Sequence, residues 1–224
     1  SIHYASIIQG AILPPTELLN KWFREYFILY RPRDIVSGDF YWFREFKHKT
    51  GTILITATAD CTGHGVPGAF MSMLGVSLLN EIINKTSFDN PGEILNKLRK
   101  KIKKSLKQRQ EISGSKDGMD MALCIFNSET MHLQYAGAYN PLYLIRKLNL
   151  SSKDLDSFKL TEYNDVNLFE IKADRQPVAI YRKESDFTTN ELQLQKAKRN
   201  QTLKAPRFYD CAQGASVGLF LHSR

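Results

Sequence analysis

The pattern of apolar positions predicts that the chain opens with two short helices. Residues 2–12 place Ile or Ala at the spacing of one helical face, and Pro14 and Pro15 end that helix. Thr16 can cap a second helix, which we expect over residues 17–26. Both helices are short enough to depend on packing against the rest of the fold.

Two strands and two long helices are predicted next. Residues 35–46 alternate in side-chain character and are rich in aromatic residues, and 53–59 is an apolar run that ends at Asp60, so both are typical of strands. After a Gly-rich turn, residues 69–84 are apolar on most faces, which predicts a helix buried against a sheet. A further helix follows, with apolar residues at every fourth position over 94–106.

The second half of the chain is predicted to be mainly strands. Residues 121–126 and 132–136 form a hairpin around a polar turn, and 142–146 is a further strand. Short edge strands are expected at 170–171 and 177–181. Strands in hairpins, with helices in a consecutive pair, predict an α+β fold with antiparallel sheets.

Composition places the chain among ordinary folded domains. It has 224 residues, of which 42% are hydrophobic and 24% charged, values that exclude a disordered or collagen-like chain. The apolar stretch 69–79 is interrupted by polar and small residues and is far shorter than the roughly 20 residues of a membrane span, so no span is expected. The three cysteines form no CxxC pair, which fits a reducing cytoplasm, and the start at Ser1 suggests a piece of a longer protein.

The positive charge is concentrated in two segments. The formal net charge is +8, and residues 196–224 carry six cations and one acid. Residues 97–109 hold eight cations and no acid. This helix is either a solvated cationic face or a docking face for an acidic partner or nucleic acid. It has no aromatic residue, so nucleic acid is the weaker interpretation.

Two aspartates stand out by position. Asp39 lies within an aromatic strand, and Asp60 ends an apolar one. The Gly-rich turn after Asp60 leads into a helix N-terminus, a place where anions such as phosphate bind. Acids that could bind a metal ion would therefore lie beside a phosphate site, and this combination suggests metal-assisted phosphate chemistry. The alternative is that Asp60 caps a turn and Asp39 pairs with an arginine, and the pattern alone does not decide between the two.

Two long motifs then give a resemblance. Residues 36–42, Val-Ser-Gly-Asp-Phe-Tyr-Trp, and 59–73, which begin Ala-Asp-Cys-Thr-Gly-His-Gly, closely resemble the SpoIIE-type serine phosphatase family. That family belongs to the metal-dependent protein phosphatases related to protein phosphatase 2C. Further matching segments are 6–14, 30–34, 118–123, 135–141 and 175–179. The resemblance covers about residues 1–195.

The resemblance implies a fold and an activity. The fold is two packed antiparallel β-sheets flanked by helices, a protein phosphatase 2C-like α-β-β-α sandwich that is incomplete here at the C-terminus. The activity is hydrolysis of phosphoserine or phosphothreonine on a signalling regulator, such as an anti-sigma-factor antagonist, by water activated by two Mn²⁺ or Mg²⁺ ions. The start at Ser1 suggests an upstream sensor or coiled-coil segment in a longer parent protein, soluble or membrane-anchored, and the cysteine pattern favours a cytoplasmic location for this part.

Site residues follow by match of motif. Asp60 is expected to bridge both metals, Asp39 to bind a metal directly or through water, and the Cys61 carbonyl to be a ligand. Asp120 is a weaker candidate. The phosphate-binding turn is expected at Gly63, His64 and Gly65.

The resemblance stops near residue 195. The family continues with a Ser-Asp-Gly segment and further metal aspartates, whereas residues 196–224 contain only Asp210. We therefore expect a partial phosphatase domain over 1–195 and a non-matching basic tail over 196–224. Two alternatives to the enzyme stay open: a catalytically dead pseudophosphatase or truncated fragment that binds a protein partner, and a basic nucleic-acid binder.

Overall fold

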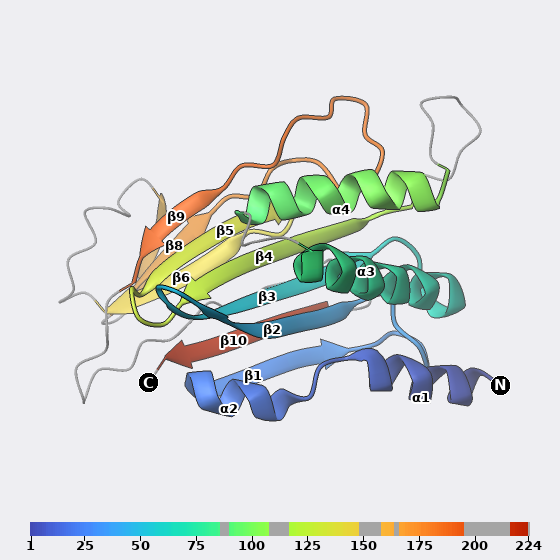
Figure 1. The fold of residues 1–224 in the computed structure, drawn as a ribbon, viewed down its shortest axis with the longest axis horizontal. Helices are drawn as coiled ribbons and strands as arrows, with labels where there is room; N and C mark the ends of the chain where they lie inside the picture. Colours follow the sequence, from blue (N-terminus) through green and yellow to red (C-terminus); the bar gives the residue numbers. More distant parts are fainter. Residues whose placement is uncertain (86–89, 108–116, 148–157, 164–165, 195–215, 224) are drawn as a thin grey trace.

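The computed structural model gives the chain an α+β fold (Figure 1) and describes residues 1–85, 90–107, 117–147, 158–163, 166–194 and 216–223. The helices are α1 (Ile2–Ile12), the short 3-10 helix η1 (Thr16–Leu18), α2 (Leu19–Trp22), α3 (Gly65–Lys85) and α4 (Pro91–Ser105). The strands are β1 (Phe23–Arg31), β2 (Phe40–His48), β3 (Gly51–Cys61), β4 (Met119–Asn127), β5 (His132–Ala138), β6 (Leu142–Lys147), β7 (Lys159–Tyr163), β8 (Val166–Ile171), β9 (Asn190–Gln193) and β10 (Ser216–Ser223).

A five-stranded antiparallel sheet is the centre of the molecule. Its strand order is β2-β3-β4-β5-β9, and α3 and α4 pack on one face. Strand β3 is buried almost throughout because both of its faces are covered. The core under the helices includes Phe40, Trp42, Ile55, Leu79, Leu98 and Leu123.

The other face of this sheet packs against a second layer of strands. That layer consists of the three-stranded sheet β6-β8-β7 and the pair β1-β10. Tyr135 of the central sheet packs with Leu144 and Phe169 of the three-stranded sheet. Phe43 and Phe126 of the central sheet pack near β1 and α2. The expected fold, two layers of antiparallel sheet with helices, is confirmed.

The N-terminal prediction was partly wrong. Helix α1 covers the predicted residues, but the helix expected over 17–26 ends at Trp22 and β1 follows. Aromatic and β-branched residues dominate residues 23–31, and β1 pairs with β10 along its length. A strand partner from far along the chain therefore overrides the local helical pattern.

The strand expected at 177–181 is also absent from the described residues of that segment. This part of the chain runs as a loop, and the Val178 N–H donates to the Met119 carbonyl at 2.8 Å. The loop is thus tied to the end of β4. The edge strand expected at 170–171 does exist, as the end of β8.

Helix α3 begins at Gly65, four residues before the predicted start. It is long and apolar enough, by length and composition, to cross a membrane, which the interrupted apolar run did not suggest. More than half of that stretch, 56%, is buried inside the molecule. Leu79 and Ile82 pack on the central sheet, as in a core helix.

The basic helix α4 is less free than its sequence suggests. Arg99 is only 6% exposed and donates to Gln176 and to the Ser185 carbonyl, at 3.0 and 2.8 Å. Lys103 pairs with Glu184 at 2.7 Å. The prediction of a wholly solvated cationic face was therefore wrong for these two residues, which join α4 to the loop that follows β8.

Part of the basic tail forms regular structure. Residues 216–223 form β10, which pairs antiparallel with β1 and contacts β2 and β3. Residues 195–215, with Asp210, lie outside the described residues. The division at residue 195 stays a prediction.

Candidate metal centre

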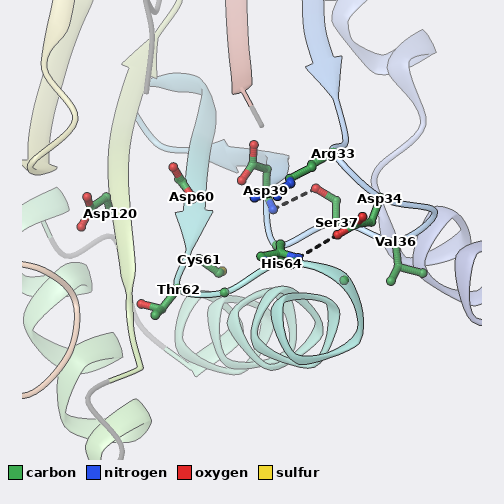
Figure 2. Close-up of a pocket in the computed structure, with 13 residues that line it drawn as sticks. Arg33, Asp34, Val36, Ser37, Asp39, Asp60, Cys61, Thr62, His64 and Asp120 are labelled. Carbon is green, nitrogen blue, oxygen red and sulfur yellow. Dashed lines mark hydrogen bonds and ion pairs between the residues drawn. The ribbon is translucent and has the colours of Figure 1, made fainter. Parts of the chain in front are cut away.

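Three aspartates lie side by side at one end of the central sheet. Asp60 of β3 is directly opposite Asp120 of β4 in the strand register. Asp39 immediately precedes Phe40, which pairs with Ala59, so the register places Asp39 beside Asp60. Figure 2 shows the three carboxylates on the same side of the sheet. The weakest sequence candidate, Asp120, is therefore next to the strongest.

Burial and mutual repulsion disfavour the charged forms of these acids. Asp39 is 2% exposed, and its pKa is raised to about 7, first by burial and then by the charge of Asp60. Burial, followed by the same neighbour, raises the pKa of Asp120 to about 6. The Oδ2 atom of Asp39 has no hydrogen-bond partner among the described residues. Buried acceptors without donors and with like charges nearby are the arrangement that a bound cation stabilises.

The turn after β3 is held in place by close glycine contacts. A Cβ on Gly38 would lie 2.8 Å from the Gly63 carbonyl oxygen and 3.1 Å from that of Cys61. A Cβ on Gly68 would come even closer to the Gly63 oxygen, at 2.6 Å. A larger residue at either position would push the turn away from the aspartates. The two glycines therefore fix where the Cys61 carbonyl lies.

The Cys61 side chain belongs to the core under the helices. It is 3% exposed, and burial, followed by the charges of Asp60, Asp39 and Asp120, raises the pKa of its thiol well above the ordinary value. Sulfur is a poor partner for a hard cation among oxygen donors, so the carbonyl oxygen remains the predicted ligand of this residue.

His64 lies at the mouth of the site and is held by Asp34. The His64 Nδ1 and Asp34 Oδ2 atoms are 2.9 Å apart, with the two side chains 65% and 39% exposed. His64 is in the turn just before α3, which places the positive end of that helix at the same opening. Asp34 was not among the predicted site residues, because its partner is 30 positions away and no local pattern joins them.

Helix α1 anchors the segment that carries Asp39. The Gln9 Nε2 donates to the Ser37 carbonyl at 2.6 Å and to the Ser72 hydroxyl at 2.8 Å. The Gln9 Oε1 accepts from the Ser37 N–H at 2.9 Å, and the Ser37 hydroxyl accepts from the Asp39 N–H at 3.0 Å. Gln9 is itself 7% exposed. This buried amide fixes the backbone beside Asp39, a role that the amphipathic pattern of residues 2–12 did not indicate.

The three aspartates and the turn after β3 line an open cleft of about 310 Å³. The cleft is large enough for a phosphorylated side chain, and the cation Arg33 lines it as well as the acids. In the part of the chain that the structure describes, no three His, Cys, Asp or Glu side chains are grouped tightly enough to hold one metal ion on their own. The lining includes Arg33, Asp34, Asp39, Asp60, Cys61, Gly63, His64, Gly65 and Asp120.

Comparison with known proteins gives the site a context. Residues 50–159 match the family model described as Stage II sporulation protein E (SpoIIE). Curated protein sequences give no match to the chain. Among solved structures, the SiaA-PP2C domain of Pseudomonas aeruginosa is similar with a TM-score of 0.64 and 29% identity, over 87% of this chain and 66% of that one.

Two further solved structures share the fold at lower identity. The PP2C phosphatase domain of SpoIIE from Bacillus subtilis, solved with a fragment of its regulatory domain, has a TM-score of 0.53 and 16% identity, over 78% of this chain and 44% of that one. The RsbU and RsbW domains of a Mycobacterium tuberculosis protein have a TM-score of 0.50 and 19% identity, over 78% of this chain and 42% of that one. The chain thus spans less than two thirds of each of these three structures.

Proposed function

We propose that this chain, which belongs to the SpoIIE-type family of PP2C-like phosphatases, is a metal-dependent protein serine/threonine phosphatase. The observation that carries the proposal is the row of three aspartates, in which the buried Asp39 Oδ2 lacks a partner. The proposed substrate is a phosphorylated signalling regulator in the cytoplasm. Anti-sigma-factor antagonists, which the sequence resemblance implies, are one such class.

The residues present fit Mn²⁺ or Mg²⁺. Carboxylate and carbonyl oxygens are the donors that these hard cations prefer, and Asp39, Asp60, Asp120 and the Cys61 carbonyl supply them. When bound, the cations supply Lewis-acid activation of water and neutralise charge on the phosphoryl oxygens. Because the described side chains are sparsely grouped, water would have to complete the coordination of a bound cation, as is usual for Mg²⁺.

The chain's own residues hold the phosphate at the mouth of the cleft. Arg33 offers an attractive charge, and the first N–H groups of α3 can donate hydrogen bonds to an anion. The Asp34 carboxylate orients the His64 imidazole through Nδ1, which leaves Nε2 to hydrogen bond with an oxygen of the phosphate ester. The tight Gly38–Gly63–Gly68 contact keeps this turn from moving as substrate enters.

The first test is hydrolysis of a phosphoserine peptide in the presence of Mn²⁺. We expect turnover by the unmodified chain and a loss of at least about 100-fold in Asp60→Asn, because one carboxylate fewer weakens the cation site that stabilises the transition state. Glu93→Gln is the control: it removes the same charge from an exposed position on α4 and should not change turnover. Calorimetric titration with Mn²⁺ should show the same contrast between the two variants.

A second candidate function is supported by one observation. Because no three side chains among the described residues form a tight cation site, the fold is also compatible with a protein-binding module that lacks catalysis. Folded protein that neither binds Mn²⁺ nor hydrolyses the peptide would contradict the phosphatase proposal and favour this module.

A further inference from the structure

The row of site residues continues one strand beyond the aspartates. Met121 of β4 pairs with Ala138, the last residue of β5, so Tyr139, the residue after β5, follows beside Asp120. The strand ends of β2, β3, β4 and β5 therefore present three acids and then an aromatic side chain. This tyrosine is 39% exposed and does not belong to the core.

Tyr139 is held in a conformation that disfavours side chains. Its φ is +58°, in the left-handed region, which is unfavourable for a residue other than glycine. The turn is fixed on both sides: the Tyr139 N–H donates to the Asp174 carbonyl at 2.9 Å, and the Tyr135 hydroxyl donates to the Asn140 carbonyl at 2.6 Å. The surrounding structure thus forces a large aromatic ring outward, next to the acids.

Two residues of the loop after β8 join Tyr139. Its hydroxyl donates to the hydroxyl of Tyr181 at 3.2 Å. Arg175 directly follows Asp174, whose carbonyl accepts from the Tyr139 N–H, so Arg175 lies beside Tyr139 along the loop. Arg175 is exposed, while the adjacent Gln176 is buried and bonded to Arg99, which fixes the loop. We call Tyr139, Tyr181 and Arg175 the tyrosine platform.

We propose that the tyrosine platform binds the substrate segment next to the phosphorylated residue, and that Arg175 selects an acidic side chain there. The inference rests on the proposed phosphatase function, which it extends to substrate choice. Strands lie about 4.8 Å apart, so Tyr139 is about 10 Å from Asp60, the length of about three residues of extended peptide. Tyrosine rings provide rigid contact area, and arginine binds carboxylates in a two-pronged geometry.

The direct test is binding, measured apart from catalysis. Fluorescence anisotropy with peptides that carry a non-hydrolysable phosphonate in place of phosphoserine compares Glu with Ala at the third position on either side. We expect the Glu peptide, on one side, to bind about three- to fivefold more tightly, the range of an exposed ion pair. Arg175→Ala should remove this preference. The charge-matched control Lys100→Ala, on the exposed face of α4, should keep it.

A second variant reports on the aromatic part of the platform. Tyr139→Gly suits the left-handed backbone, so its melting temperature should stay close to that of the unmodified chain. We expect the ratio of kcat/KM for a phosphopeptide to that for a small aryl phosphate to fall about fivefold, because only the peptide reaches the platform. An equal loss on both substrates would overturn the inference. Two binding results would also overturn it: no preference of the unmodified chain for the Glu peptide, or a preference that survives Arg175→Ala. If the chain binds the Glu peptide selectively but hydrolyses neither substrate, the platform stands and the phosphatase proposal fails.

Discussion

Among the residues that the structure describes, two charged side chains are almost fully buried, and their surroundings are opposite. Arg99 is 6% exposed and bonds to Gln176, Asn96 and the Ser185 carbonyl, with its guanidinium 4.8 Å from the centre of the Phe187 ring. Asp39 is 2% exposed, yet one of its oxygens has no partner in the described part of the chain, and the charge that raises its pKa is another acid, Asp60. A structural charge is satisfied by the fold itself, whereas Asp39 is left to be satisfied by something that binds.

The largest expected effect comes from breaking the satisfied charge. Arg99→Met keeps the length of the stem but removes the charged group that donates to Gln176, Asn96 and the Ser185 carbonyl, so the free energy of unfolding should fall by about 3 kcal/mol. Urea unfolding measures this loss. Lys100→Met, at the exposed neighbouring position, should change stability by no more than about 0.5 kcal/mol. Equal losses in the two variants would mean that the buried network contributes little.

The opposite sign is expected at the unsatisfied charge. Asp39→Asn removes a buried negative charge, so in the presence of EDTA at pH 8 the free energy of unfolding should rise by about 2 kcal/mol. Saturating Mn²⁺ should reduce or reverse this gain, because the cation binds the folded aspartate and stabilises the unmodified chain. Glu93→Gln removes an exposed charge and should show neither effect. A metal-free Asp39→Asn chain that is less stable would contradict the comparison.

The smallest expected effect is the pH dependence that remains in Asp39→Asn. The folded pKa of Asp120 is about 6, above the ordinary value of 3.8, so the folded chain keeps a proton that the unfolded chain releases. Its contribution to stability is therefore complete below about pH 4 and is lost as pH rises through 6, and the part lost between pH 5 and pH 8 is about 1 kcal/mol. Thermal unfolding of metal-free Asp39→Asn at pH 5 and pH 8 measures it. Adding Asp120→Asn should flatten the profile, and an unchanged slope would assign it to other groups.

The sequence was sufficient for those parts of the site that lie within one segment. Asp39 directly precedes the aromatic strand β2, and Asp60 lies near the end of the apolar strand β3, just before the Gly-rich turn. The position of Asp120 beside Asp60 depends on the β3–β4 register, and the pairing of Asp34 with His64 depends on two loops meeting. Neither leaves a periodic signal, so the position of Asp120 beside Asp60 and the pairing of Asp34 with His64 were not predicted.

The same distinction holds for the fold. Strands joined by short turns and helices with clear apolar faces were predicted within a few residues, because their partners are close in sequence. The first residues of strand β1, 23–26, were predicted as the end of a helix, since the partner of this strand, β10, is far away along the chain. Gln9 resembled an ordinary polar residue of a short helix, although it fixes the backbone beside Asp39. Tertiary contacts decided each of these cases.

The pairing of β1 with β10 also has a consequence for biosynthesis. Residues 23–31 leave the ribosome long before residues 216–223, and every pair in this ladder joins those two segments. Until the later strand is made, the backbone of β1 has an open edge on which Phe27 and Leu29 are exposed even in the folded chain. Contacts of such long sequence separation form slowly. The nascent chain is therefore expected to need protection at this edge, from a chaperone or from a neighbouring segment, until translation reaches β10.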